Sequence, residues 1–520
     1  MTTEAFNPVN HLQDAVEDDI QQIIDAWEGT DPVPLNLVVN DATATALKVT
    51  NTSGGYALDV YGPARFSSTL STAGGPIFDV KNGYEADNTG VTACDAEFAA
   101  AIAAIPAAGG RLYVPAGTYL LSGAVTIDKP VYMYGDGRGA TFIKTSSTTA
   151  NMFNVTAASG KECTFDGLYF GTTVTKTDGA YIKFTPGSGA VVEYTLIKDC
   201  QFQGGWTGAD MTDAPYFTIS NCIFHSYRFV GVIVDCTVNA DAGDSLITDN
   251  CQFSGVGVNP SYGILQRASG GLKIIGNKGN QPGNAFYFLD LRAGAVTSGL
   301  SIVGNNIEAA SVAQIAFAQN GGSGGYSNIV IADNKMGGSL VDISVSTAGN
   351  WLKGLSITGN NTVLGANKFV SLTGGYDVLI EGNLITDATT GSVLLENSAG
   401  ASVVRLGKNW APSVESWYTG PAPLLVDPDI QHGAFAGSTN AAYAGGALFT
   451  TADITVTFPS PFMSAPTVVA SASGAAGAYN GVIAVAIKSI AADSFVCCII
   501  GQTNGQTVTG QYSAYGIMDY

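Results

Sequence analysis

A short phrase recurs through the middle of the chain: an apolar run, a small or polar residue, and then Asn or Asp. Its last residue falls at Asp199, Asn221, Asn250, Asn277, Asn305, Asn334, Asn360, Asn383 and Asn409. The successive gaps are 22, 29, 27, 28, 29, 26, 23 and 26 residues. A period of this length without helical spacing is typical of a solenoid in which each repeat forms one coil.

Two or three β-branched runs in each repeat indicate strands, for example 299–303 and 313–317. The pair that ends in Asn suits a tight bend, because Asn tolerates the left-handed conformation. Neither the fixed Leu frame of leucine-rich repeats nor the aromatic-Asp signature of propeller blades occurs. The pattern therefore predicts an all-β, right-handed parallel β-helix, whose bends stack the Asn side chains about 4.8 Å apart.

Before the repeats, residues 9–28 predict an amphipathic helix, with apolar residues at steps of three and four and acidic residues on the other face. Residues 35–75 read as short strands. We expect the apolar stripe of the helix to pack on sister copies in a small bundle or against another protein. The strand piece 35–75 is too small to fold alone with ease, so we expect it to intertwine with other copies.

The passage that opens the solenoid has a recognisable order. Phe-Asp-Val-Lys (78–81) precedes an Ala-rich helix expected over 93–105, then Val-Pro-Ala-Gly-Thr-Tyr (114–119) and Tyr-Gly-Asp-Gly (134–137). Since the first coil of a solenoid would otherwise expose unpaired strand edges, we expect the helix to cover that end.

This opening resembles the pectate-lyase-like parallel β-helices of bacteriophage tailspikes, and the likeness covers roughly 76–410. Where the family usually has Gly-Asp-Gly-x-x-Asp-Asp-Thr, this chain has the loop 85–95, which bears on the geometry of the cap. The resemblance implies a homotrimer in the phage tail, assembled in the host cytoplasm. It also implies a bacterial surface polysaccharide as ligand, and attachment to a tail or baseplate protein through 1–75.

After Asn409 the period is lost and a Pro-rich exit follows. Residues 427–520 have alternating strands with spaced Gly turns, which predict a small antiparallel β-sandwich. Their order of Phe, Pro and closing aromatic residues is similar to lectin-like or trimer-capping modules of tail fibres. We therefore predict three domains, at 1–75, 76–426 and 427–520.

Composition excludes several classes of protein. The net charge of −20 argues against nucleic acid or an anionic membrane as partner. No apolar stretch is long enough for a membrane span, and the first ten residues lack the basic start and apolar core of a signal peptide. Cys200, Cys222 and Cys251 each follow a repeat Asp or Asn, which predicts a column of reduced interior thiols. Neither a metal nor a cofactor is expected.

One set of candidate catalytic residues closes the second strand of successive repeats: Asp235, Gln266, Asp290 and Gln319, flanked by Arg267 and Arg292. Asp235 and Asp290 would lie about 9–10 Å apart across two coils. Inverting glycosidases hold their carboxylates roughly 6.5–9.5 Å apart, so that a water fits between them. The alternative is that a strand-end Asp caps a turn.

A rival cluster is Trp206, Asp210 and Asp213, in which the indole stacks on a sugar while one Asp protonates the glycosidic oxygen. Tyr227, Tyr262 and Tyr287 are further candidates for stacking, although an outward Tyr on a strand is ordinary. Three more carboxylates remain possible: Glu193, Glu308 and Asp342.

Three functions stay open at this point. The first is a depolymerase that hydrolyses capsule or O-antigen, and the acid-rich, His-poor composition favours hydrolysis over elimination. A lyase would need a neutralising cation and a base, for which Arg267, Arg292 and Tyr287 are available. The others are a receptor-binding fibre without enzymatic activity and a purely structural virion component.

Overall fold

The computed structural model describes residues 69–516 with internal gaps. The gaps are 73–74, 157–161, 188, 239–242, 257–259, 320–324, 347–351, 366, 390, 398–403, 412–415, 420–423, 427–428, 443–448, 452, 459–464, 475–481 and 502–505. The helix predicted at 9–28 and nearly all of the strands predicted at 35–75 lie outside the described residues. No helix among the described residues is long and apolar enough to cross a bilayer.

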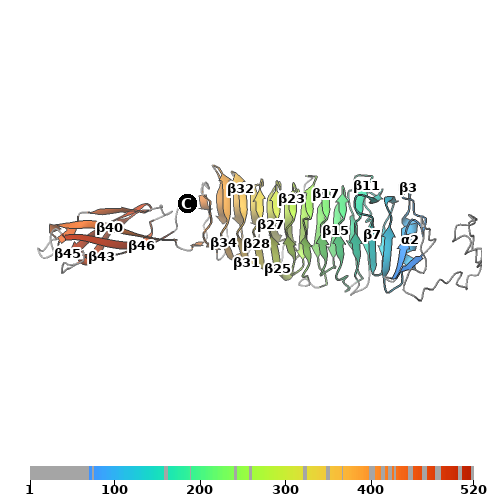
Figure 1. Ribbon diagram of the computed structural model, residues 1–520, viewed down its shortest axis with the longest axis horizontal. Helices are drawn as coiled ribbons and strands as arrows, with labels where there is room; N and C mark the ends of the chain where they lie inside the picture. Colours follow the sequence, from blue (N-terminus) through green and yellow to red (C-terminus); the bar gives the residue numbers. More distant parts are fainter. Residues whose placement is uncertain are drawn as a thin grey trace, which may run out of the picture. The chain divides into compact units, whose positions relative to one another are not determined.

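The prediction of a parallel β-solenoid is confirmed, with about 11 coils. Three sheets run along the stack (Figure 1). The first sheet has 15 strands, parallel except for the β1–β2 pair. They are β1 (Thr69–Thr72), β2 (Gly75–Asp79), β4 (Gly110–Val114), β7 (Val131–Gly135), β10 (Thr164–Asp166), β13 (Leu196–Lys198), β16 (Thr218–Ser220), β19 (Leu246–Thr248), β22 (Lys273–Ile275), β25 (Val296–Val303), β28 (Gly325–Ala332), β31 (Leu352–Thr358), β34 (Tyr376–Glu381), β37 (Val404–Leu406) and β39 (Leu424–Val426).

The second and third sheets have 12 parallel strands each. The second consists of β3 (Thr89–Ala93), β5 (Gly117–Leu121), β8 (Thr141–Thr145), β11 (Tyr169–Thr172), β14 (Gln201–Gln203), β17 (Ile223–Tyr227), β20 (Gln252–Gly255), β23 (Lys278–Asn280), β26 (Asn306–Glu308), β29 (Lys335–Gly337), β32 (Asn361–Gly365) and β35 (Leu384–Ala388). The third consists of β6 (Val125–Ile127), β9 (Phe153–Val155), β12 (Ala180–Phe184), β15 (Thr207–Thr212), β18 (Val230–Asp235), β21 (Tyr262–Ala268), β24 (Ala285–Leu291), β27 (Ala313–Gln319), β30 (Val341–Ser346), β33 (Lys368–Leu372), β36 (Val393–Asn397) and β38 (Ser416–Thr419).

The predicted Asn ladder occupies the bend between the first and second sheets. Asn305 Nδ2 donates to Asn334 Oδ1 at 2.9 Å, and Asn334 Nδ2 donates to Asn360 Oδ1 at 2.9 Å. The same pairing joins the buried Asn side chains from 277 to 409. Each amide also receives a backbone N–H from the coil before it, as Asn334 Oδ1 does from Asn305. The ladder thus satisfies polar groups that burial would otherwise leave unpaired.

At its N-terminal end the ladder differs from the predicted row. Asn221 and Asn250 hold positive φ angles of 49° and 63°, and Asn250 is exposed. They occupy the left-handed position that Gly276 fills in the next coil, where φ is 69°. The inward position belongs instead to the Cys that follows, because Cys251 N donates to Asn277 Oδ1 at 3.1 Å. The repeated phrase therefore does mark the bend. At Asp199, Asn221 and Asn250, however, the inward position is taken by the Cys one residue later.

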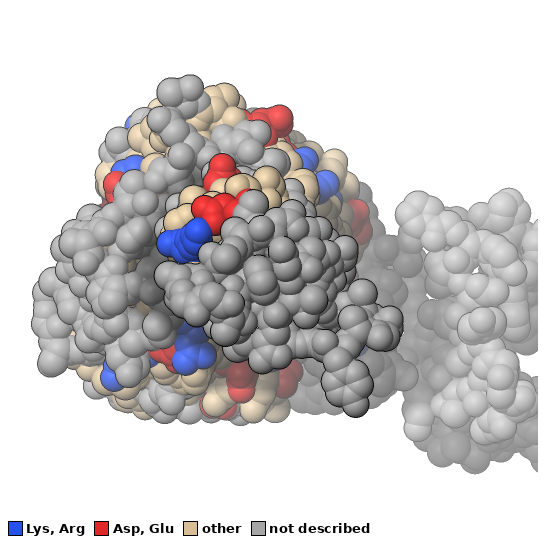
Figure 2. All heavy atoms as spheres, turned by 90° about the vertical axis from the view of Figure 1, so that its left-hand side faces the viewer, with Lys and Arg blue, Asp and Glu red and all other residues tan. Residues whose placement is uncertain are grey.

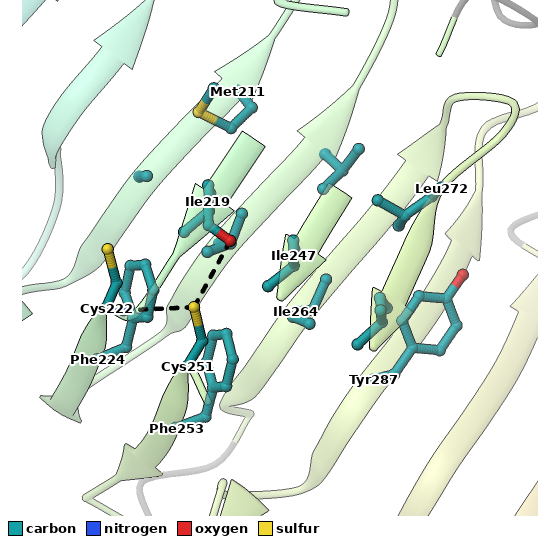
Figure 3. Close-up of a cluster of buried hydrophobic side chains, with 14 of the residues drawn as sticks. Met211, Ile219, Cys222, Phe224, Ile247, Cys251, Phe253, Ile264, Leu272 and Tyr287 are labelled. Atoms are coloured by element: carbon teal, nitrogen blue, oxygen red, sulfur yellow. Dashed lines mark hydrogen bonds between the residues drawn. The ribbon is translucent and has the colours of Figure 1, made fainter. Parts of the chain in front are cut away.

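The prediction of buried, reduced thiols is confirmed for Cys200, Cys222 and Cys251. Figure 3 shows Cys222 and Cys251 on neighbouring coils, with Phe224 and Phe253 beside them. The two Phe rings lie 5.0 Å apart and within 4° of parallel. Burial raises the pKa of the Cys222 thiol well above its ordinary value, so this column packs as small apolar side chains.

Among the described residues there is one helix, α2 (Asp95–Ala104), which lies at one end of the stacked sheets (Figure 1). It buries Phe98, Ala101 and Ile102, and the Phe98 ring packs edge-on to Tyr119 with centroids 5.8 Å apart. In the loop before it, the Asp87 carboxylate accepts hydrogen bonds from Thr89, Val91 and Thr92. The cap expected over 93–105 is confirmed, and Asp87 orders the loop that departs from the family pattern.

Beyond the solenoid, seven strands form one antiparallel sheet. They are β40 (Asp429–Ala442), β41 (Phe449–Thr451), β42 (Ile454–Thr457), β43 (Thr467–Gly474), β44 (Val482–Ile490), β45 (Ser494–Gly501) and β46 (Gln506–Gly516). Phe458, Phe495 and Tyr512 pack together in a small core of their own. The antiparallel strands agree with the prediction for 427–520, whereas the two-sheet sandwich stays a prediction.

We expect Asn334→Ala to lower the free energy of unfolding by about 2 kcal/mol, because it leaves the Asn305 amide N–H and side-chain amide without their acceptor inside the coil. Thermal unfolding of the full chain measures the loss. Asn280→Ala is the matched control, because Asn280 is exposed on β23. Equal stability of the two variants would show that the ladder contributes nothing measurable.

Candidate functional site

The outer face of the third sheet carries an unusual apolar patch. Along β18, Val232 and Val234 join the interior core, whereas Val230 and Ile233 belong to a separate cluster with Leu265. Ile233 stands between the two core residues, and neighbouring strand residues face opposite sides, so the cluster to which Ile233 belongs lies on the outer side of the sheet. Its three residues are themselves buried, because the partly buried Phe229, Tyr262 and Phe288 pack against them.

Four aromatic side chains on successive coils extend this patch. Trp206 stacks on Phe229 with centroids 5.5 Å apart, Phe229 meets Tyr262 edge-on at 6.4 Å, and Tyr262 stacks on Phe288 at 4.5 Å. All four are partly exposed. In the coil before Trp206 the register places Gly179, which has no side chain. Gly179 therefore adds no side chain over the indole from that coil, and we expect a sugar ring to stack on this side.

Carboxylates and arginines follow this aromatic row toward the strand ends. Val234 pairs with Gln266 but Asp235 pairs with Ala268, so Arg267 is the extra residue of a β-bulge. Burial raises the pKa of both Asp235 and Asp290, and the Arg267 charge opposes this rise at both carboxylates. Bulges often re-aim a side chain next to an active site.

Asp235 has the most perturbed carboxylate of this group. It is 7% exposed, and burial raises its pKa to about 6, despite the opposing charges of Arg292 and Arg267. Arg292 Nη2 lies 3.4 Å from Asp235 Oδ1 and donates to the Cys236 carbonyl at 2.6 Å. Burial also raises the pKa of Asp290, whose charge in turn raises that of Tyr262. Such perturbed groups in one patch are typical of functional sites.

Asp210 and Asp213 adjoin this group, because the charges of both raise the pKa of Asp235. Asp210 accepts from Thr212 Oγ1 at 2.6 Å and lies 3.5 Å from Lys183 Nζ. Asp213 accepts from the Thr237 amide N–H at 2.5 Å and from its hydroxyl, which fits the turn-capping alternative. The two clusters that the sequence offered as rivals therefore form one patch, here called the carboxylate patch: Asp210, Asp213, Asp235, Arg267, Asp290 and Arg292.

Three of the predicted binding residues are buried and do not reach the outer surface. Tyr287 and Gln266 are fully buried inside the solenoid, where the Tyr287 hydroxyl donates to Gln266 Oε1 at 2.6 Å. Tyr227 is buried as well, and its hydroxyl donates to the Pro282 carbonyl at 2.7 Å. The expectation that these side chains point outward is corrected, and only Tyr262 of the three tyrosines lies on the surface patch.

The predicted column of alternating Asp and Gln is also corrected. Gln266 aligns with Leu289 on the next coil, so it faces inward while Asp235 and Asp290 face outward. Gln319 ends β27 and pairs with Leu291. Gln266 also pairs with the core residue Val234 of the coil before it, so its inward direction is set ahead of the bulge at Arg267.

The other carboxylates lie elsewhere. Glu308 is exposed on the second sheet, 3.6 Å from Lys335 Nζ. Asp342 is buried within the solenoid, and Glu193 is half-buried in the loop before β13. In the part of the chain that the structure describes, no group of His, Cys, Asp and Glu has the geometry of a metal site.

Comparison with known proteins places the fold. Residues 77–175 match the family model described as rhamnogalacturonase A/epimerase, pectate lyase-like. The match covers the cap helix and the opening coils of the solenoid, which are similar to pectate-lyase-like proteins. A search of curated proteins finds no match.

Among solved structures, the catalytic unit of an α-1,3-glucanase from Streptomyces thermodiastaticus strain HF3-3 is 15% identical over 70% of this chain and 69% of its own, with a TM-score of 0.52. The tailspike of E. coli bacteriophage HK620 is 11% identical over 84% and 93%, with a TM-score of 0.49. The Pseudomonas phage phi297 tailspike is 11% identical over 84% and 99%, with a TM-score of 0.43. At these identities the likeness concerns the fold.

Two aromatic residues of this β-helix patch, Phe229 and Phe288, were missed from the sequence. The signal was present for Phe229, because Trp206, Phe229 and Tyr262 each stand at the start of a strand of the third sheet. Phe288 lies in mid-strand in an apolar run, where the inward or outward direction depends on the register. Figure 2 views the molecule end-on, and acidic and basic side chains lie side by side among the described residues in sight there.

Proposed function

We propose that this protein is a bacteriophage tailspike that binds a bacterial surface polysaccharide, capsule or O-antigen, and hydrolyses it at the carboxylate patch. The supporting observation is the juxtaposition of an exposed aromatic row with a buried carboxyl group whose pKa is raised to about 6. Aromatic rings stack on the apolar faces of sugars, and a carboxylic acid that stays protonated near neutral pH can protonate a leaving oxygen.

In the proposed mechanism Asp235 is the general acid and Asp290 the general base. Their strands are two coils apart, which separates the backbones by about 10 Å and leaves room for a water between sugar and base. Asp235 donates its proton to the glycosidic oxygen while Asp290 takes a proton from the attacking water. The positive charge of Arg267 opposes the rise that burial causes in the Asp290 pKa, which favours the ionised form that a base requires.

Elimination is the second candidate, because Arg267 lies between the carboxylates and Tyr262 lies close to Asp290. In that reaction an Arg neutralises a sugar carboxylate and the tyrosine removes the proton beside it. Tyr262 takes the part for which Tyr287 was predicted, since Tyr287 is buried. A fibre that binds without cleaving would use the aromatic row alone.

One assay distinguishes these functions. The full chain is incubated with purified capsular polysaccharides and O-polysaccharides from a panel of bacterial strains, and reducing ends and ultraviolet absorbance are followed. Hydrolysis gives reducing ends without absorbance, elimination gives both, and a binding fibre gives neither but retains one polysaccharide in a pull-down. Failure to bind any polysaccharide that coats a host of the phage would overturn the proposal.

The homotrimer and the attachment to a phage tail or baseplate protein through residues 1–75 are part of this proposal. The many neutral and apolar side chains on the surface of a parallel β-helix suit packing against further copies. We expect light scattering of the full chain to give three times the mass of one chain. A monomer at micromolar concentration contradicts this expectation.

A further inference from the structure

A second bend of the solenoid, which lies just before or within the strands of the first sheet, has a left-handed residue in eight successive coils. Each lies two places before strand residues that the register aligns with one another. The φ angles run from 44° to 81°. These residues are Tyr194, Tyr216, Asp244, Gly271, Gly299, Asn328, Gly354 and Asp377.

Six of the eight are Gly, Asp or Asn, the residue types that adopt this conformation at low cost. Tyr194 and Tyr216, with φ angles of 57° and 60°, are the exceptions. A bulky side chain in the left-handed region is strained, and such strain is found preferentially at binding and active sites. The bend itself does not require Tyr, since the six later coils form the same bend with Gly, Asp or Asn.

The two tyrosines form a pair on the surface. Their ring centroids lie 5.5 Å apart with the planes at 20°, and Tyr194 is 58% exposed. The strained backbone therefore presents stacked rings toward solvent instead of burying them. This arrangement offers an open aromatic face and two ring edges with hydroxyl groups, the combination that holds a pyranose ring.

The pair is continuous with the carboxylate patch. Tyr216 belongs to the short loop that follows β15, and Asp213 stands at the start of the same loop. The Val192 amide N–H, in the loop that carries Tyr194, donates to the Asp213 carbonyl at 3.0 Å. Both rings thus lie at the end of the third sheet where Asp210 and Asp235 are found.

We propose that Tyr194 and Tyr216 form a second sugar-binding platform, separate from the aromatic row, which stacks on one pyranose unit of the bound polysaccharide. This inference rests on the proposed polysaccharide ligand. It makes the binding surface longer than the carboxylate patch and requires a polymer of several sugar units as ligand.

The test uses Tyr194→Asn and Tyr216→Asn in the full chain, because Asn is the natural residue at the same place in the coil of Asn328. Binding is measured by calorimetry with the purified capsular or O-polysaccharide that the wild-type chain retains. Each Asn variant is expected to bind on the order of tenfold more weakly, while its melting temperature stays equal or rises. Tyr194→Phe keeps the ring and is expected to retain most of the affinity.

Asp377→Asn at the same bend is the matched control and should leave binding unchanged. If the Asn variants melt lower and bind as wild type does, the tyrosines are packing residues and the platform is wrong. If they lose the wild-type oligomeric state, the rings cover a neighbouring copy and the platform is likewise wrong. A wild-type chain that binds no polysaccharide removes the proposed function and this inference together.

Discussion

Asp235→Asn is expected to lower the rate of polysaccharide hydrolysis by about 10²- to 10⁴-fold while binding persists. The amide cannot donate a proton that it regenerates in each turnover, and removal of a general acid typically has an effect of this size. Because the pKa of Asp235 is raised to about 6, the wild-type rate should also fall as the pH rises above 6, by tenfold per pH unit once the acid is mostly ionised.

Release of reducing ends from the retained polysaccharide, measured from pH 4 to pH 9, gives both results. Asp249→Asn is the matched control, because Asp249 is exposed at the bend between the first and second sheets in the next coil. Asp290→Asn should be nearly as inactive as Asp235→Asn if Asp290 is the base. Full activity of Asp235→Asn would falsify its assignment, and full activity of Asp290→Asn together with an inactive Asp210→Asn would move the base to Asp210.

The fold was predictable because each coil of a solenoid has the same packing and hydrogen-bonding requirements as its neighbours. The bend that ends in an inward Asn recurs in successive coils from Asn277 to Asn409, and buried amides must pair, so the spacing of these residues already implies the ladder. The offset at Asn221 and Asn250 was harder to see. In those coils a polar residue takes the left-handed place of Gly276, and the inward place passes to a Cys.

The candidate site was only half predictable, because it depends on which way each side chain faces. Asp235 and Asp290 were found from their position at strand ends, and both do face outward. Gln266 was placed in the same column, but the register pairs it with Val234 of the coil before and Leu289 of the coil after, both of which belong to the core. A count of residues from one bend to the next cannot show this, since the loops differ in length from coil to coil and a slip of one residue reverses the face of a side chain.

Asp342 raises a different question, because it is a carboxylic acid inside the solenoid core. The register places it between Gln314 and Phe369 of the neighbouring coils, and it is 2% exposed. Ser339 Oγ donates to Asp342 Oδ1 at 3.0 Å, and the Thr362 hydroxyl donates to its other oxygen. Burial outweighs these bonds and raises its pKa from 3.8 to about 7.

We expect Asp342→Asn to stabilise the protein above pH 7 by up to about 4 kcal/mol relative to wild type, and by little at pH 4. The folded pKa lies above the unfolded one, so the folded chain holds an extra proton between pH 4 and pH 7. The contribution of Asp342 to stability is therefore complete below pH 4 and is lost as the pH rises to 7. Asn keeps the shape and carries no charge at any pH.

Melting temperatures of the full chain at pH 4, 6 and 8 measure this difference, with Asp249→Asn as the exposed control that should follow wild type throughout. If the difference in melting temperature between Asp342→Asn and wild type increases with pH, the buried charge of Asp342 is what destabilises the wild-type chain. A gap that is the same at every pH would mean that the hydrogen bonds to Ser339 and Thr362 decide the stability of this coil. Since neighbouring coils contact one another along the whole stack, such a local cost would weaken the rod at one place rather than uniformly.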